Sequence, residues 1–324
     1  MRTRTWCAGL VIAVCGEALI DLIVSADGQV SAHPGGGPYN TALALARLGA
    51  ATAFFGRLSG DRFGRLLRDG LVAHGAVLGV PEPSAAPTTL AVADLDQSGA
   101  ASYGFHLLGT AAADLAYPAL RAALPADVDA VHVGTLGLVM EPAGAAIERL
   151  VRTDVPPSAL VMLDPNCRPA AIADKAAYLR RVEGIVRRAD IVKASREDLG
   201  YLYPERSPEQ AAKGLLAAGS AVVLVTNGPH PARAFLPDTV LTAGVPRVDV
   251  TDTIGAGDAF GAGFLAWWLA HGLGPAELKW PALVGDALRT AAAVAALACT
   301  RPGADPPTLD EVRAGDWWAE PERA

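Results

Sequence analysis

Short apolar segments of strand length alternate along this chain with longer segments rich in alanine and leucine. Strands that alternate with helices form crossover units, and such units build a mostly parallel sheet covered by helices on both faces. The pattern therefore predicts an α/β core. Its expected strands are Leu10 to Val14, Thr52 to Phe55, Ala130 to Val133, Leu160 to Leu163, Ile191 to Val192 and Val222 to Thr226.

Two segments interrupt this alternation and are expected to form hairpins. Both show apolar residues with a period of two around a turn that contains Asp and Gly, Asp27-Gly28 in one and Asp96 to Gly99 in the other. Such strands can form a small second sheet, either as a lid over a cleft or as surface hairpins without function. The expected strands are Ala18 to Val24, Gln29 to Ala32, Thr88 to Leu95 and Ala100 to His106.

A glycine turn, Val250 to Phe260 (VTDTIGAGDAF), is expected to join an apolar strand to a long apolar helix. Gly255 and Gly257 let the backbone approach a ligand closely, and the free amides and dipole at a helix start favour an anion there. Asp258 in the same turn is either an N-terminal helix charge or a base. An alcohol that attacks a phosphoryl group must lose a proton while charge grows on the transferred group. The turn is therefore interpreted as a phosphate cradle that contains its own base.

Composition excludes several classes of partner. The 324 residues are 51% hydrophobic and 19% charged, with a formal net charge of −7, and no block of Lys and Arg occurs. This balance predicts a globular protein that does not bind nucleic acid. Cys7, Cys15, Cys167 and Cys299 are scattered without a CxxC pair. That spacing predicts reduced thiols in a cytoplasmic protein rather than disulfides or a zinc site.

The amino-terminal segment superficially resembles the start of a signal peptide. Two early arginines precede the apolar run Cys7 to Val14, but Glu17 and Asp21 follow at once, so a buried first strand is favoured. No segment reaches the roughly 18 uninterrupted apolar residues of a membrane span. The closest, Thr290 to Cys299, is expected to be a packed helix, and no membrane association is predicted.

Two clusters at strand ends could meet a ligand, because an open α/β sheet binds ligands at that edge. The glycine-rich segment His33 to Asn40 leads into an expected helix, Thr41 to Leu48. It could let a polyhydroxylated ligand touch the backbone, with Asn40 as donor and acceptor, or form a plain turn. The segment Asp164 to Arg168 ends on an Arg suited to a phosphate or to a surface ion pair.

Two further clusters have equally balanced local interpretations. In Lys193 to Asp198, Glu197 could help to hold hydrated Mg²⁺, or Ser195 could cap a helix with acidic residues in its first turn. Thr226-Asn227-Gly228 could support a nucleotide phosphate or simply reverse the chain.

Two segments resemble the signatures of the ribokinase-like (PfkB) sugar kinases: the glycine-rich start with its helix, and Asp252 to Asp258. The resemblance implies one ribokinase-like domain over residues 1–324, with a three-layer α/β/α core, a mostly parallel sheet and a β-sheet lid formed by approximately 17–33 and 88–107. Further segments are similar to the fructokinase-type branch. They are Gly56 to Gly64, Pro87 to Leu90, Asp164 to Arg168 and Lys193 to Glu197.

The resemblance implies ATP-dependent transfer of the γ-phosphate to a primary hydroxyl of a small sugar, and often a homodimer formed through the lid. Asp258 would be the base that deprotonates this hydroxyl. The other implied catalytic residues are Gly255, Ala256 and Gly257, whose amides form the anion hole, and Arg168. The implied substrate-binding residues are Asp21, Gly36, Asn40, Phe105 and His106.

The resemblance also places the nucleotide and the cations. The implied ATP-binding residues are Ser195, Thr226, Gly228 and Ala292, and Glu197 is implied to associate with Mg²⁺. Oxygen ligands in a loop behind the anion hole suit K⁺. The implied ligands of this monovalent cation are Asp252, Ile254, Ala298, Arg301 and Gly303.

Departures from the family pattern leave the substrate open. The lid segment Ser102 to His106 lacks the Arg often found there in fructokinase-like members, Pro229 replaces a usual glycine of the nucleotide loop, and Pro307 replaces a small polar residue of the cation loop. Fructose is one candidate, and 2-keto-3-deoxygluconate, ribose and nucleoside-like substrates are alternatives.

Two other classes of protein stay open as minor alternatives. Gly255-x-Gly257-x-x-x-Gly261, with Glu277 about 20 residues further on, partly matches a dinucleotide-binding fingerprint. Its place near the carboxyl terminus and the Asp258 carboxylate within the turn speak against a dehydrogenase. A catalytically silent sugar-binding relative is the other alternative.

Overall fold

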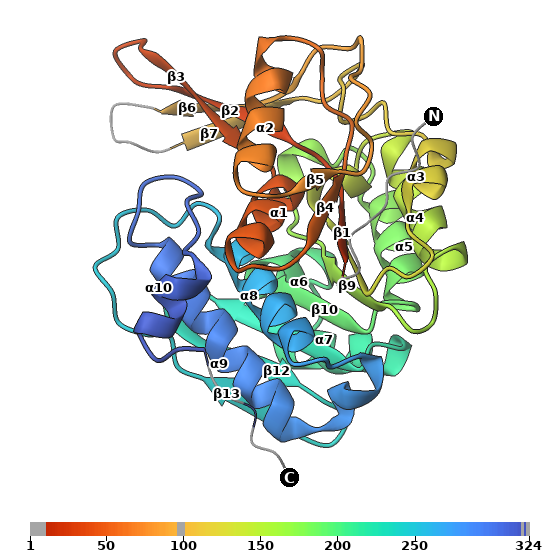
Figure 1. Ribbon diagram of the computed structural model, residues 1–324, viewed down its shortest axis with the longest axis vertical. Coiled ribbons are helices and arrows are strands. Elements are labelled where there is room, and N and C mark those ends of the chain that lie inside the picture. The colour runs from red at the N-terminus through yellow and green to blue at the C-terminus, as the bar shows by residue number, and fades with distance from the viewer. Residues whose placement is uncertain (1–10, 96–100, 319–320, 322–324) are drawn as a thin grey trace.

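A nine-stranded sheet lies between two layers of helices in the computed structural model, which describes residues 11–95, 101–318 and 321 (Figure 1). The strand order is β13-β12-β11-β10-β9-β8-β1-β4-β5, and the seven strands from β11 to β5 are parallel. Their bounds are β1 Ile12–Cys15, β4 Thr52–Phe55, β5 Val77–Leu78, β8 Ala130–Gly134, β9 Leu160–Asp164, β10 Ile191–Ser195, β11 Val222–Asn227, β12 His230–Phe235 and β13 Val240–Ala243.

Both faces of this sheet are buried, which explains why its central strands are apolar throughout. In β1, Ile12 and Val14 enter one core cluster, whereas Ala13 and Cys15 enter the other. Successive side chains of a strand point to opposite faces, so a strand covered on both sides needs apolar residues at every position. The first cluster contains the bulky Trp267 and Trp268, and the second contains mainly aliphatic residues.

The helices divide between these two faces. The first face is covered by α1 Gly37–Arg47, α2 Arg62–Ala73, α8 Ala256–Ala270, α9 Pro281–Ala298 and α10 Leu309–Ala314. The second is covered by α3 Tyr117–Ala123, α4 Ala143–Thr153, α5 Lys175–Val186, α6 Arg196–Leu202 and α7 Pro208–Ala218. Short 3₁₀ turns, η1 Thr135–Leu138, η2 Pro169–Ala171 and η3 Pro275–Lys279, complete the connections.

The α/β core expected from the sequence is confirmed. The six expected strands correspond to β1, β4, β8, β9, β10 and β11, although Leu10, like Cys7, lies outside the described residues. The strands β5, β12 and β13 were not predicted. The apolar strand expected just before the glycine turn is wrong, because residues 244–250 form neither strand nor helix. In β12, the proline Pro231, which has no amide hydrogen, and the charged Arg233 obscure the strand pattern. Because β12 runs antiparallel to β11, the Thr226-Asn227-Gly228 segment reverses the chain.

A second sheet of four strands projects from the amino-terminal part of the core (Figure 1). The two predicted hairpins form it by pairing β2 with β6 in parallel, and the order is β3-β2-β6-β7. The bounds are β2 Leu19–Val24, β3 Val30–Gly35, β6 Thr89–Leu95 and β7 Ala101–His106. The predicted turn Asp96 to Gly99 lies outside the described residues. The second sheet is therefore confirmed, while its function as a lid stays a prediction.

The alanine-rich segment Thr290 to Cys299 forms most of the second half of α9, as expected for a packed helix. Within the described part of the chain, α9 alone is long and apolar enough to cross a membrane by length and composition. Of its apolar window, 67% is buried inside the fold, and the helix packs along α8. Its apolar character is accounted for by this packing.

Replacement of Phe264 by Ala is expected to lower the free energy of unfolding by about 3 to 5 kcal/mol. Phe264 is 0% exposed on α8 and stacks on Trp268 at 5.6 Å between ring centroids, so truncation leaves a cavity beneath the helix. Urea unfolding followed by circular dichroism measures the change. The control is Val72→Ala, because Val72 is 58% exposed on α2. A loss for Phe264→Ala no larger than that of the control would contradict the packing described for α8.

Candidate active site

The helix α1 begins at Gly37, four residues earlier than the sequence suggested, and this shift brings Asn40 into its first turn. Gly36 precedes the helix with φ 108°, a conformation that favours glycine. Pro38 occupies a first-turn position, where a missing amide hydrogen has no cost to the helix. The glycine-rich segment is thus a helix start as well as the end of β3.

The helix α8 begins in the same manner at the second signature. Gly255 caps it in the left-handed conformation with φ 76°, and the helix starts at Ala256. The backbone amides of Gly255, Ala256 and Gly257 therefore surround the positive end of an apolar helix of 15 residues. Asp258 lies in this first turn and is buried. The predicted glycine turn with a carboxylate inside it is present, and its binding of an anion stays a prediction.

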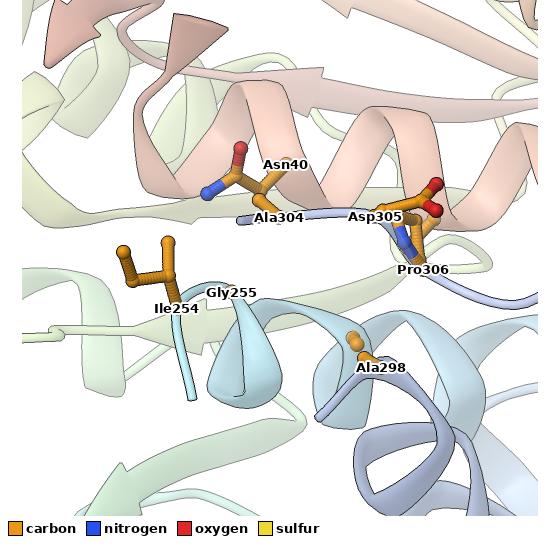
Figure 2. Close-up of a pocket in the computed structure, with 9 residues that line it drawn as sticks. Asn40, Ile254, Gly255, Ala298, Ala304, Asp305 and Pro306 are labelled. Carbon is orange, nitrogen blue, oxygen red and sulfur yellow. The ribbon is translucent and has the colours of Figure 1, made fainter. Parts of the chain in front are cut away.

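The first turns of α1 and α8 meet, although they are more than 200 residues apart in the chain. Asn40 Nδ2 donates a hydrogen bond of 2.9 Å to Asp258 Oδ2. Figure 2 shows Asn40 on α1 facing the Gly255 turn, with the segment Ala304 to Pro306 passing between the two helices, around a narrow cavity that these residues line. The fold thus joins the two signatures into one site.

Gly37 is the point of closest approach in this site. A Cβ atom there would lie 2.4 Å from Thr135 Oγ1, 3.2 Å from Asn166 Nδ2 and 3.3 Å from Asp258 Oδ1. Thr135 and Asn166 follow β8 and β9, and both have positive φ angles of 54° and 37°. Their backbone conformations are unusual for residues with a side chain, which is common in functional sites. The sequence placed Asn166 in a strand-end cluster that could meet a ligand, but it gave Thr135 no role.

Burial sets the protonation state of Asp258. Loss of solvent raises its pKa to about 7, while Lys193, the hydrogen bond from Asn40 and Arg168 oppose this rise, and Asp164 adds to it. A carboxyl group with a pKa near neutrality is suited to accept a proton from an alcohol and to release it again. Asn40 engages Oδ2 and leaves Oδ1 for such an acceptor role.

Two buried charged groups near Asp258 were not predicted. Glu17, 0% exposed, accepts hydrogen bonds from the amides of Gly37 and Gly137, at 3.2 and 2.7 Å, and so connects α1 to η1. Burial raises its pKa to about 8. Lys193 on β10 forms an ion pair of 2.7 Å with Asp164 at the end of β9. A lysine inside an otherwise apolar strand segment was the signal that could have identified it.

The second sheet presents one of its faces to the carboxyl edge of the main sheet. Asp21 on β2 pairs with His33 and Ala91, and Ala91 pairs with Phe105 on β7, so these residues share a face. Burial raises the pKa of Asp21 to about 6, against the attraction of Arg168 and His33. Arg168 follows β9, and its guanidinium donates to Asn166 Oδ1 at 2.7 Å. Asp21, Phe105 and Arg168 thus border the same space.

His106 does not join them. It pairs with Leu90, one position along the strand, and adjacent residues of a strand point to opposite faces. Its side chain is exposed on the far side from Asp21, whereas Phe105 is partly buried against the core. The expectation that His106 faces a sugar is therefore corrected, while Phe105 stays a predicted contact of the sugar.

The residues expected around the nucleotide differ in accessibility. Ser195 caps α6 by a reciprocal pair of hydrogen bonds with Asp198, which was one of the two local interpretations, and Glu197 in the same turn is exposed. Thr226 and Gly228 lie at the β11 end of the hairpin, next to Ser195 through the pairing of β10 with β11. Ala292 is 2% exposed inside α9, so its expected contact with the nucleotide is corrected: its side chain packs in the core.

The loop expected to hold a monovalent cation is assembled behind the anion-hole turn. Asp252 Oδ1 accepts from the amide of Ile254 at 3.0 Å, and Oδ2 accepts from Gly303 at 2.8 Å, which ties together segments 51 residues apart. The guanidinium of Arg301 is paired with Glu311 and Asp305, so the residue can offer its carbonyl oxygen to the loop. Carboxylate and carbonyl oxygens fit a hard monovalent cation. No group of three or more His, Cys, Asp or Glu side chains that could hold a metal ion occurs within the described ranges.

Comparison with known proteins identifies the family to which this chain belongs. Residues 11–311 match the model of the pfkB family carbohydrate kinases. The chain belongs to this family. It is 35% identical to the fructokinase of Rhizobium leguminosarum bv. trifolii over 260 residues, which is 79% of each chain. The resemblance noted in the sequence is confirmed, and the protein is an ATP-dependent sugar kinase of the fructokinase-like type.

Solved structures of pfkB kinases agree with the fold. Fructokinase with bound ATP from Xylella fastidiosa superposes with a TM-score of 0.85 at 29% identity, covering 94% of this chain and 97% of the other. Fructokinase from Vibrio cholerae O395, in a form with fructose, ADP and calcium ion bound, gives a TM-score of 0.78 at 27% identity, with 91% and 94% covered. The expected ribokinase-like architecture with its additional small sheet is confirmed.

Replacement of Gly37 by Ala is expected to reduce kcat/KM at least about tenfold, because displacement of reacting groups by about 1 Å can cost two orders of magnitude. The new methyl group would contact Thr135 Oγ1 and Asp258 Oδ1. The control is Gly200→Ala on α6, where a Cβ atom meets nothing within 4 Å. Circular dichroism confirms folding, and a coupled assay of ADP release measures the rate. Wild-type kcat/KM in Gly37→Ala would show that this close approach is irrelevant to the reaction.

Proposed function

We propose that this pfkB kinase transfers the γ-phosphate of ATP to a primary hydroxyl group of fructose at the junction of α1 and α8. The observation that carries the proposal is the 2.9 Å hydrogen bond between Asn40 and Asp258, which joins a polar, glycine-rich turn to a turn built for an anion. The fructokinases of Rhizobium leguminosarum and Vibrio cholerae support the choice of a ketohexose. Arg168 and Asp21, at the border of the same space, supply charged hydrogen-bonding groups for sugar and phosphate.

Each reacting group has its own place in this proposal. Asp258 Oδ1 accepts the proton of the sugar hydroxyl, while Asn40 holds Oδ2 and orients the carboxylate. The amides of Gly255, Ala256 and Gly257, with the dipole of α8, stabilise the charge on the phosphoryl group as it is transferred. Asn40 Oδ1 is buried without a hydrogen-bond partner within the described residues, and a sugar hydroxyl would supply the missing donor.

The second sheet acts as the lid of a single kinase domain, in this proposal. Its Asp21 face covers the sugar and excludes water, which would otherwise accept the phosphoryl group. Two exposed apolar side chains, Val30 and Tyr103, lie on its strands and would be covered in a homodimer formed through the lid. The free cysteines Cys15, Cys167 and Cys299 agree with a cytoplasmic location.

Cations are assigned to two places. Glu197, exposed at the start of α6 near Ser195, would hold Mg²⁺ through water, and the metal would neutralise charge on the phosphates. The nucleotide would lie along Ser195, Thr226 and Gly228. K⁺ would occupy the loop of Asp252, Ile254, Ala298, Arg301 and Gly303, where it would steady the anion-hole turn from behind.

A panel of acceptors tests the proposed substrate. The purified chain is assayed for ADP release from MgATP with fructose, ribose, 2-keto-3-deoxygluconate and a nucleoside, with and without K⁺. Fructose is expected to give the highest kcat/KM, and phosphorylation at the primary hydroxyl is checked by mass spectrometry and NMR. A higher kcat/KM with one of the other acceptors would replace fructose as the substrate. If none of the acceptors is phosphorylated, the result would contradict the kinase mechanism itself.

Replacement of Asp258 by Asn is expected to lower kcat by about 10²- to 10⁴-fold, because general-base catalysis contributes a factor of this size. Asn keeps the shape of the side chain but does not accept the proton. Fructose binding, measured by calorimetry, is expected to change little. The matched control is Asp114→Asn, since Asp114 is an exposed carboxylate with an ion pair to Arg57 at 3.3 Å. A kcat near that of the wild type in Asp258→Asn would remove Asp258 from the role of base.

A further inference from the structure

Lys193 is a buried cation directly beneath the anion-hole turn, and the catalytic scheme above does not use it. Its side chain is 4% exposed and that of its partner Asp164 is 3% exposed, so both charges are removed from water. Removing charges from water is costly, and the loss of one partner of such a pair is strongly destabilising. The buried ion pair of Lys193 and Asp164 therefore restricts which backbone and side chains can pack against it.

The first turn of α8 lies against the Lys193 ammonium. A Cβ atom on Gly257 would be 2.9 Å from Lys193 Nζ, so the glycine leaves the space that the ammonium occupies. Close approach of this cation is a second reason for glycine at position 257, besides the approach of an anion from the other side. The buried positive charge and the amides of the turn lie on the same short segment of backbone.

Titratable side chains from several elements face this region. Around Lys193 and Asp258 these are Asp164 on β9, Asp198 on α6, Arg168 after β9 and Glu17 after β1. His132 on β8 is also buried nearby, and burial together with Lys193 lowers its pKa to about 3, which keeps it neutral. Burial alone would lower the pKa of Lys193, but the carboxylates of Asp164, Asp198 and Asp258 together outweigh it and raise this pKa, so the ammonium stays charged.

We propose that Lys193, held by Asp164 beneath Gly257, is a positioning residue that fixes the first turn of α8 and keeps the catalytic base Asp258 ionised. Lys193 is 3% exposed, less than Asn40 and Asp258 at 7% each, and it is assigned no contact with the sugar or the phosphates. It acts through its charge on Asp258 and through its contact with Gly257. The inference rests on the proposed role of Asp258 as the base.

Replacement of Lys193 by Met tests the proposal, because Met fills a similar volume without a charge. In the wild type, kcat/KM is expected to fall below about pH 7, since Asp258 has its pKa there and must be ionised to accept a proton. In Lys193→Met this acid limb is expected to move up by about one pH unit, the effect of removing a nearby opposite charge. Lys193→Arg keeps the charge and is expected to keep the limb at its wild-type pH.

A double variant keeps the test decisive if Lys193→Met does not fold. Asp164→Asn/Lys193→Met leaves no unpaired charge in the buried pair. Lys193 lowers the pKa of Asp258 by more than Asp164 raises it. The acid limb of the double variant is therefore expected between those of the wild type and Lys193→Met. The control Lys213→Met, on an exposed position of α7, is expected to leave the profile unchanged.

An acid limb that stays at the wild-type pH in the double variant, with only the maximal rate reduced, would reduce Lys193 to a structural residue and overturn the inference. If Lys193→Met folds and its acid limb stays at the wild-type pH, this single variant would also overturn the inference. Failure of the proposed function looks different: the wild type would then transfer phosphate to no sugar, or Asp258→Asn would keep full activity.

Discussion

The hydrogen bond between Asn40 and Asp258 is the contact on which the rest of the site depends. It joins the amino-terminal turns of two helices that pack on the same face of the sheet, and each turn is made possible by a glycine with positive φ, Gly36 and Gly255. The loops after the parallel strands β8 and β9 open at one edge of the sheet, and Thr135 and Asn166 in these loops lie beside the α1 turn. The backbone amides of the α8 turn, the buried Asp258 carboxylate and the Asn40 amide are thereby brought together.

Burial and charge are balanced around this contact. Desolvation alone would leave Asp258 protonated at neutral pH, and the Lys193 ammonium is the largest effect in the opposite direction. Glu17 shows what happens where no cation lies close: burial raises its pKa to about 8, and its carboxyl group serves to hold two backbone amides. Two carboxyl groups in one buried region thus have separate uses, set by their neighbours.

The small sheet contributes through its register. Asp21, Ala91 and Phe105 stand on one row, so the face that looks toward Arg168 is fixed by the pairing of β2 with β6 and of β6 with β7. A shift of one residue would turn this face away and expose His106 to the site instead.

The sequence by itself determined the α/β core, the two hairpins and the two glycine turns, because strand periodicity, glycine conformation and helix-start chemistry are local properties. It also supplied Asp258 and Asn40 as candidates. Only the tertiary structure decided that Asn40 contacts Asp258, that His106 points away and that Ala292 is buried, since these depend on register and on helix packing. The tertiary structure also decided that Lys193 and Asp164 lie beneath Gly257. Two neighbouring parallel strands and a helix start from a distant part of the chain enclose this pair.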